Sequence, residues 1–514
     1  MAVEDPYRWI ESVAQSAGHS LCLEDDLGRR MSYAEVHQSV GRYGAVLLDL
    51  GVHVGDRVAL LVEKSLEAVL VYLACLRVGA AVVPLNTAYT AAELRHFISD
   101  SQPQVLIVDP ATTEAAVEIA AANGCPTVET LGARGNGSIA NRVEMQSVGS
   151  PVISIAADTL AALLYTSGTT GRSKGAMITR GNLVANAQCL ASSWQMTRED
   201  LLVHVLPLFH VHGLFLSLNT MFAVGAAVRI HRIFDPRLTI ESLSNGSVFM
   251  GVPTHYTRLL ACPELTPEAV SGVRLFISGS APLLSETHRE FEVRTRKVIL
   301  ERYGMTETLV NTSNPYTGVR KPGSVGLPLP GVELRITDQR TDGDGPNVGM
   351  IEIRGPNVCA GYWRAPDQTA ADRTVDGYFR SGDLGFIDSD GYLHISGRAK
   401  DLVITGGYNV YPKEIELELD RLDQISESAV FGVPHRDFGE AVTAAVILKP
   451  SAAMHEATVI ELMRNRLARY KVPKRVIVVD ELPKNTMGKI QKNKLRERFA
   501  HLYLDTLAKP NGIR

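Results

Sequence analysis

The sequence is poor in the features that mark secreted or membrane-spanning proteins. Only 6 of its 514 residues are cysteine, and none of them forms a C-x-x-C pair. Such sparse cysteines exclude a disulfide framework and a zinc site of the usual spacing, and they favour a reducing compartment. No run of ~18 uncharged apolar residues occurs, and the N-terminus lacks the cationic start and apolar stretch of a signal peptide. We therefore expect a cytoplasmic protein that does not enter a membrane.

Excess charge of one sign and aromatic residues are also lacking. The 52 Lys and Arg residues nearly balance the 56 Asp and Glu residues, and only 6% of residues are aromatic. Surfaces that bind nucleic acid are strongly basic and often carry stacking aromatics, so we expect no nucleic-acid partner. Hydrophobic residues, at 45%, are typical of a globular protein, and the length predicts roughly two to four packed units.

Short apolar runs alternate with helix-like segments through about the first 300 residues. Glu67–Val78 is predicted to be a buried helix, and Gln104–Val108 and Leu275–Ile277 are predicted strands. This alternation is typical of βαβ units around a buried parallel sheet. Leu131–Ser150, in contrast, is rich in Gly, Ser and Asn and is predicted to be a loop.

The composition and pattern of the sequence change twice after this region. From residue 322 to 397, Gly, Asp and Pro punctuate short strands, which predicts a β-rich subdomain. Residues 401–514 then form a compact set of helix-like and strand-like segments. We therefore expect an α/β fold with a large N-terminal domain at 1–397, made of βαβ-type subdomains plus the β-rich subdomain, and a small α+β C-terminal domain.

The strongest local signal is the segment YTSGTTGRSKG at Tyr165–Gly175, directly after the apolar run Leu160–Leu164. Glycines allow a tight backbone turn whose N–H groups reach an anion, hydroxyls add donors, and Lys174 adds a positive charge. The segment differs from a Walker A motif, in which glycine directly precedes the lysine, because here Ser173 precedes Lys174. A solvent-exposed Ser/Thr/Gly loop is the alternative, which the density of donors beside a strand disfavours.

This segment resembles the phosphate loop of the adenylate-forming enzymes, which include acyl-CoA synthetases, luciferases and adenylation domains. Four further segments resemble the family's other motifs in the same order: YGMTE at 303–307, YFRSGD at 378–383, GRAKD at 397–401 and PKNTMGK at 483–489. Ser381 stands where the family usually has Thr. The resemblance covers nearly the whole chain. It implies a mobile C-terminal lid at 401–514 and a hinge at 398–400 around Lys400.

The family's reaction implies ATP, Mg²⁺ and CoA as cofactors or co-substrates. A carboxylate attacks the α-phosphate of ATP, and CoA then displaces AMP from the acyl-adenylate. The first step needs charge stabilisation rather than a protein nucleophile. The resemblance assigns nucleotide binding to Thr166, Ser167, Gly168, Thr169, Thr170, Gly171, Lys174, Ser278, Gly279, Ser280, Ala281, Glu301, Arg302, Tyr303, Gly304, Met305, Thr306, Asp383, Arg398 and Lys489.

Within that set the resemblance implies specific roles. Lys489 and Lys174 would stabilise charge, Glu307 and Thr166 would hold magnesium, and Asp383 would accept hydrogen bonds from the ribose hydroxyls. Gly406 and Gly407 would line the route of CoA. Each has a plainer alternative: a solvated basic face for Lys489, a charge at a helix N-terminus for Glu307, a turn for Asp383 and a surface ion pair for Arg398.

The sequence indicates the carboxylic acid substrate less directly than it indicates the nucleotide. The pocket segments that the family implies contain His210, His212, His255 and Arg258 instead of only small apolar residues. If Arg258 is buried it needs an anion, and a guanidinium matches a carboxylate well; an arginine extending from a surface helix is the alternative. A short dicarboxylate would supply that second carboxylate.

Four segments further resemble the malonyl-CoA synthetase branch: residues 85–90, 209–213, 251–260 and 311–316. The resemblance implies malonate as the acid, with methylmalonate as a second substrate, bound by Arg258, His210, Ser278 and Met305. His210 would position the carboxylate, or else be a structural histidine. The alternatives are another short or aryl acid, a free-standing adenylation enzyme that feeds a carrier protein, and a catalytically silent nucleotide-binding protein. We expect a monomer or a homodimer.

Overall fold

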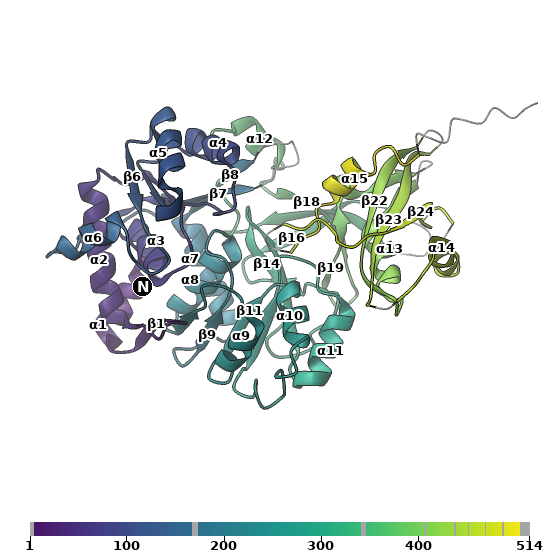
Figure 1. Ribbon diagram of the computed structural model, residues 1–514, viewed down its shortest axis with the longest axis horizontal. Helices are drawn as coiled ribbons and strands as arrows, with labels where there is room; N and C mark the ends of the chain where they lie inside the picture. The colour runs from purple at the N-terminus through teal and green to yellow at the C-terminus, as the bar shows by residue number, and fades with distance from the viewer. Residues whose placement is uncertain are drawn as a thin grey trace, which may run out of the picture. The chain divides into compact units, whose positions relative to one another are not determined.

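The fold is described from a computed structural model, which covers residues 5–166, 173–340, 346–405, 408–435, 438–450, 452–467, 469–485 and 488–503 (Figure 1). Its contacts divide the chain into two compact units. The first unit contains Met1–Glu333 and Ile353–Phe379, and the second contains Leu334–Glu352 and Arg380–Arg514. Both units combine helices and sheets, so the expected α/β fold is confirmed.

The first unit contains a six-stranded sheet that is parallel except at one edge. In spatial order its strands are β6 (Thr127–Thr130), β5 (Val105–Val108), β3 (Arg57–Leu61), β4 (Ala81–Pro84), β7 (Leu160–Thr166) and β8 (Lys174–Thr179). Strands β7 and β8 form an antiparallel hairpin. Helices α4 (Ala91–Ser101) and α5 (Thr113–Ala122) contribute Leu94, Phe97 and Ile119 to the core on this sheet.

The same unit contains a nine-stranded sheet. Its order is β15 (Leu327–Pro328), β14 (Leu309–Ser313), β13 (Ile299–Met305), β12 (Leu275–Ser278), β11 (Val248–Gly251), β9 (Leu201–His204), β10 (Ala227–Ile230), β1 (Leu21–Asp25) and β2 (Arg30–Ser32). From β13 to β1 neighbouring strands are parallel. Figure 1 shows α9 (Pro236–Leu243), α10 (Pro253–Leu260) and α11 (Ser285–Thr295) along one face of this sheet, where they share a buried core with β9, β11 and β12.

Helix α3 (Leu66–Val78) shows how local sequence sets an element. Ser65 caps its first turn by accepting a hydrogen bond from the N–H of Ala68, and Gly79 ends it in the left-handed region at φ 82°. Nearly every residue between is buried, as expected of an apolar helix between two sheets. The prediction of a helix at Glu67–Val78 is therefore confirmed.

The first unit contains further helical elements, of which α2 (Tyr33–Asp49) and α7 (Arg180–Ser193) are the longest. The others are α1 (Tyr7–Ala17), η1 (Pro110–Thr112), α6 (Ser138–Met145), the π-helix η2 (His212–Ser217), α8 (Leu218–Phe222) and α12 (Pro366–Ala371). Helix α6 lies in the segment 131–150, so the prediction of a loop there is wrong. Only Ile139 of this helix is buried, which explains why no apolar stripe reveals it.

The second unit contains two sheets. The first has the order β16 (Glu333–Arg340), β17 (Val348–Arg354), β18 (Phe379–Ile387) and β19 (Leu393–Arg398), followed by the single turn η3 (Ala399–Asp401). The second has the order β21 (Tyr408–Val410), β20 (Val403–Thr405), β23 (Gly439–Leu448) and β22 (Ile425–His435), with β24 (Arg475–Val478) paired to β23. Helices α13 (Pro412–Leu419), α14 (Glu456–Arg464) and α15 (Lys492–Arg498) pack on it.

Strands β16–β19 form the expected β-rich segment. Most residues of these four strands are grouped with the C-terminal residues rather than with the N-terminal body. The boundaries at 397 and 401 and the hinge at 398–400 remain predictions. Among the described helices, none has both the length and the apolar character that a membrane span requires.

Candidate active site

The β7–β8 hairpin presents the two ends of the glycine-rich segment. Thr166, the last residue of β7, and Lys174, the first residue of β8, are paired across the hairpin. The predicted phosphate-binding residues Ser167, Gly168, Thr169, Thr170 and Gly171 lie outside the described residues. Thr166 and Lys174 are both partly buried.

A buried carboxylate lies next to Thr166. The Oε1 atom of Glu307 accepts hydrogen bonds from Thr166 Oγ1 at 3.3 Å and from the hydroxyl of Tyr362 at 3.2 Å. The Lys174 ammonium lies 5.1 Å from the centre of the Tyr362 ring. Thr166, Lys174 and Glu307 are therefore brought together, and Tyr362, which follows Gly361 outside all five motifs, joins them without a sequence signal. A carboxylate and a hydroxyl are hard oxygen ligands that fit Mg²⁺ bound with substrate phosphates.

A second group of predicted residues gathers where β12 and β13 end. A Cβ atom placed on Gly279 would lie 2.5 Å from Arg302 Cζ, so the guanidinium packs directly on this glycine. Ser278 is buried, and its hydroxyl has no hydrogen-bond partner within the described ranges. Ser280 has a φ of 70°, a conformation that non-glycine residues rarely adopt and that is common at functional sites. Ala281, which follows, is partly buried.

Arg302 is the most unusual side chain of this group. It is 5% exposed, and its Nε and Nη2 atoms have no hydrogen-bond partner among the residues that the structure describes. Burial lowers the pKa of Arg302 to about 10, so the guanidinium remains positive at neutral pH. A buried cation with free donors is costly unless an anion occupies the site. The group therefore has the chemistry of a pocket for an anionic ligand.

Burial and the charge of Arg302 lower the pKa of two nearby histidines. Burial first and Arg302 second lower the pKa of His210 to about 4, and the same causes lower the pKa of His212. Both imidazoles are therefore neutral at pH 7. The N–H of His212 donates to His210 Nδ1 at 3.2 Å, and His212 Nδ1 lies 3.3 Å from Ser280 Oγ. His210, Ser280 and Arg302 thus belong to one cluster.

The rest of the YGMTE segment forms the β13–β14 hairpin. Tyr303, Met305 and Thr306 are partly buried, and Glu301 is buried with its carboxylate accepting from the N–H of Gly323 at 3.2 Å. Gly304 lies so close to the opposite strand that a Cβ atom there would be 1.8 Å from the carbonyl oxygen of Leu309. This hairpin therefore sets the positions of both Arg302 and Glu307.

Arg258 differs from the expectation of a buried cation. It lies in the last turn of α10 and is exposed. Its charge still influences His255, whose pKa burial, Lys64 and Arg258 together lower to about 3. Arg258 is thus near one histidine of the pocket segments. The buried arginine that would need an anionic partner is Arg302 rather than Arg258.

The predicted residues of the second unit gather around strands β18 and β19. Asp383 and Arg398 are cross-strand partners, and Arg398 Nε lies 2.9 Å from Asp383 Oδ1. Lys400 follows in η3, and burial and the charge of Arg398 lower its pKa. Gly406 and Gly407, predicted to line the route of CoA, lie outside the described residues.

Lys489 is presented by a tight turn in the same unit. Its N–H donates to Asn485 Oδ1 at 2.9 Å, and its carbonyl oxygen accepts from the N–H of Asn485. Although the residue as a whole is exposed, desolvation of its ammonium end and the charge of Arg398 lower the pKa of Lys489 to about 8. Asp383 acts in the opposite direction, so Lys489 lies within electrostatic range of this carboxylate.

The sequence matches two protein families. Residues 10–363 match the AMP-binding enzyme family, and residues 414–489 match the AMP-binding enzyme C-terminal domain. The crystal structure of ATP-bound MatB from Rhodopseudomonas palustris is similar with a TM-score of 0.93 and 49% identity, covering 97% of this chain and 99% of that one.

Curated relatives are similar over nearly the whole length. The malonate–CoA ligase of Homo sapiens is 34% identical, covering 95% of this chain and 91% of its own. The oxalate–CoA ligase of Arabidopsis thaliana is also 34% identical, covering 95% of this chain and 98% of its own. ATP and CoA fit this family as substrates. The chain therefore belongs to the AMP-binding enzyme family and is an adenylate-forming acyl-CoA ligase.

Proposed function

We propose that this enzyme is a malonate–CoA ligase that also accepts methylmalonate. In the first step a malonate carboxylate oxygen attacks the α-phosphorus of ATP, and the bond to the β-phosphate breaks to release pyrophosphate. In the second step the CoA thiolate attacks the acyl carbon of malonyl-AMP, and AMP leaves. Similarity to a malonate–CoA ligase supports the acid, and similarity to an oxalate–CoA ligase supports the wider class of short dicarboxylates.

The observation that carries this proposal is the buried guanidinium of Arg302, whose Nε and Nη2 atoms have no hydrogen-bond partner among the described residues. A dicarboxylate leaves one carboxylate free after the other joins AMP, and that free carboxylate would accept from Nε and Nη2 as a bidentate partner. Neutral His210 and His212 would border the pocket without competing for the anion. A monocarboxylic acid would leave the guanidinium buried and unpaired, which disfavours such acids by several kcal/mol.

The remaining residues would act on the nucleotide. Glu307 and Thr166 would hold Mg²⁺, which when bound neutralises phosphate charge. Lys174 and the predicted loop residues 167–171 would bind the phosphates, while Asp383 and Arg398 would bind the ribose. The ammonium of Lys489 would stabilise charge developing on the α-phosphate. Lys400 would serve as the hinge of a mobile lid, and Gly406 and Gly407 would line the route of CoA.

The test is a pyrophosphate-release assay over acetate, butyrate, benzoate, oxalate, malonate, methylmalonate and succinate, each with and without CoA. We expect malonate to have the highest kcat/KM, with CoA converted to its thioester. A higher kcat/KM for a monocarboxylic acid would contradict the proposal. Pyrophosphate release without any thioester formation would favour the free-standing adenylation enzyme instead.

The two arginines provide a matched pair of variants. We expect Arg302→Met to lower kcat/KM for malonate by about 10²–10³ while its activity toward butyrate is retained or raised, because the removed charge matters only to the second carboxylate. Arg258→Met, which removes an exposed charge, should change kcat/KM for malonate much less. The reverse order would move the recognition of malonate from Arg302 to Arg258.

A further inference from the structure

Lys64 is a buried lysine outside all the motifs of the nucleotide site. It lies between β3 and α3 and is 7% exposed. Its Nζ atom donates to the carbonyl oxygen of Leu206 at 3.0 Å and, more weakly, to that of His204 at 3.5 Å. These carbonyls belong to the end of β9 and the residues after it, so Lys64 connects the six-stranded sheet to the nine-stranded sheet.

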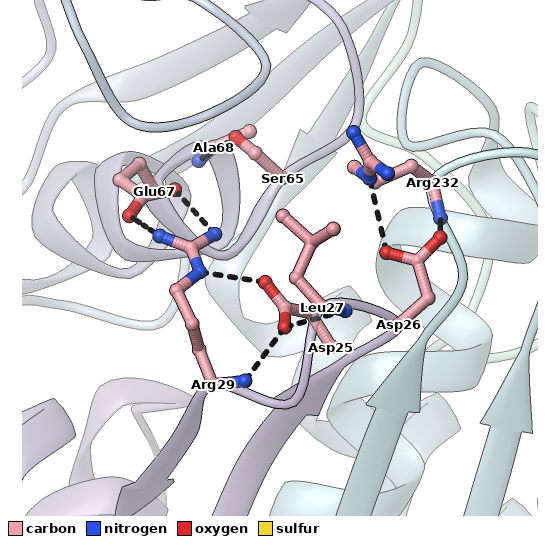
Figure 2. Close-up of polar contacts among 8 residues, drawn as sticks. All are labelled: Asp25, Asp26, Leu27, Arg29, Ser65, Glu67, Ala68 and Arg232. Atoms are coloured by element: carbon pink, nitrogen blue, oxygen red, sulfur yellow. Dashed lines mark hydrogen bonds and ion pairs between the residues drawn. The ribbon is translucent and has the colours of Figure 1, made fainter.

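The carboxylates of Asp25, Asp26 and Glu67 pair with arginines, as Figure 2 shows. Arg29 binds both Asp25, at 2.7 Å, and Glu67, at 2.6 Å. Asp26, the carboxylate whose charge reaches Lys64, is 3.0 Å from Arg232. Within the described residues no carboxylate forms an ion pair with Lys64.

A buried lysine without an ion pair stabilises a fold poorly, since an apolar side chain of similar size often serves better. The two hydrogen bonds of Lys64 therefore point to a role other than stabilising the fold. The neighbouring Ser65 caps α3 by accepting from the N–H of Ala68, so the chain that carries Lys64 is itself held at the start of a buried helix.

Residues 204–213, which Lys64 binds, form a segment whose two ends are joined by a hydrogen bond. His204 Nε2 lies 2.9 Å from the carbonyl oxygen of Gly213, which joins the two ends of residues 204–213. A Cβ atom on Gly213 would lie 2.1 Å from the carbonyl oxygen of Pro207, so only glycine fits there. His210 and His212 belong to this segment, and His212 contacts Ser280. The position of both histidines beside Arg302 therefore depends on how residues 204–213 are anchored.

We infer that Lys64 is a positioning residue for the acyl-CoA ligase reaction, which holds residues 204–213 through the carbonyls of His204 and Leu206 and so fixes His210 and His212 at the acid pocket. Lys64 acts through these histidines and need not touch the acid. The inference rests on the proposed assignment of Arg302, His210 and His212 to the acid pocket.

The first test compares Lys64→Met with Lys64→Arg and with Glu63→Gln, an exposed neighbour that serves as the control. With malonate as the probe, we expect Lys64→Met to raise KM for malonate by about 10–100-fold, because a displaced pocket binds the acid poorly. The kcat and the KM for ATP should change by less than about threefold. Lys64→Arg should recover part of the loss, and Glu63→Gln should behave as the wild type. Parallel changes in KM for ATP and malonate, or none, would overturn the inference.

A double-mutant cycle tests whether Lys64 acts through the histidine segment. In a His210→Asn background, Lys64→Met should cost much less than it does alone, because the residue that it positions is already changed. Fully additive losses would contradict the inference. Circular dichroism checks that each variant is folded, and if Lys64→Met is not, Lys64→Gln and Lys64→Arg are compared in its place.

The outcome separates this inference from the proposed function. A wild-type enzyme that does not use malonate contradicts the malonate proposal, and the same variants are then measured with the acid that the pyrophosphate screen selects. A selective rise in KM for that acid supports Lys64 as a positioning residue whatever the acid is. A wild-type enzyme that uses malonate, with Lys64→Met unchanged, supports the function and overturns the role of Lys64.

Discussion

At the scale of single residues, we expect Lys489 to make adenylate formation sensitive to pH. The ammonium is the form that stabilises phosphate charge, and its pKa is lowered to about 8 by desolvation and by Arg398. The proton is bound below this pKa and lost above it, so adenylate formation should fall as pH rises through about 8. Pyrophosphate release measured from pH 6.5 to 9.5 at saturating substrates tests this expectation.

A nearby variant identifies the group that titrates. Arg398→Gln removes a cation that lowers the pKa of Lys489. The fall in activity on the alkaline side of the pH profile, the alkaline limb, should therefore move to higher pH. Lys484 lies in the same turn but pairs with Glu427 at 2.7 Å, and Lys484→Gln should leave the limb in place. A limb that stays fixed in Arg398→Gln would assign the titration to another group.

Sequence motifs predicted which residues lie at the site better than they predicted the side chains that surround those residues. The glycine-rich segment and the YGMTE segment led directly to Thr166 and Glu307, which the structure joins by a hydrogen bond. The motifs did not reveal Tyr362, which contacts both Glu307 and Lys174. They assigned Arg258 to the acid and Arg302 to the nucleotide, because burial and missing partners depend on long-range packing.

At the scale of elements, buried segments were predictable and polar ones were not. The helix at Glu67–Val78 and the strand at Gln104–Val108 appear within one residue as α3 and β5, since apolar runs of such lengths have few other folds. Helix α6 was missed because its residues are mostly polar and only Ile139 packs inward. Strand β13 continues past its apolar part to Met305 through pairing with β14, which no local pattern encodes.

The β13–β14 hairpin allows a prediction at this scale. Because a Cβ atom on Gly304 would lie 1.8 Å from the carbonyl oxygen of Leu309, Gly304→Ala must separate the two strands that carry Arg302 and Leu309. We expect a loss of about 2–4 kcal/mol in the free energy of unfolding, with reduced activity toward both ATP and the acid. Denaturant unfolding measures the first effect and pyrophosphate release the second.

Gly272 provides the control for this substitution. A Cβ atom there would have its nearest neighbours at 3.4 Å, and the residue is exposed. Gly272→Ala should therefore change stability by less than about 1 kcal/mol. Equal effects of the two substitutions would show that the close approach at Gly304 does not limit the hairpin.

At the scale of the whole molecule, the proposed site residues are divided between two units with separate cores. The first unit carries Arg302, Glu307 and Lys174, and the second carries Asp383, Arg398 and Lys489. Each unit has its own buried apolar clusters, such as the one around Phe249 and Phe276 in the first and the one around Val430 and Val442 in the second. We propose that Arg302 serves both half-reactions, whereas Lys489 serves only one.

The two half-reactions place different demands on these residues. The acyl group must be held in both, so Arg302→Met should impair both adenylate formation and transfer from supplied malonyl-AMP to CoA. Charge on the α-phosphate develops only in the first, so Lys489→Ala should slow adenylate formation by about 10²–10³ and change transfer by less than about fivefold. Lys484→Ala, in the same turn, is the control for both assays. If Lys489→Ala slowed both half-reactions equally, Lys489 would act on a group common to both, such as the ribose that Asp383 is proposed to bind, and the division of labour between the units would be wrong.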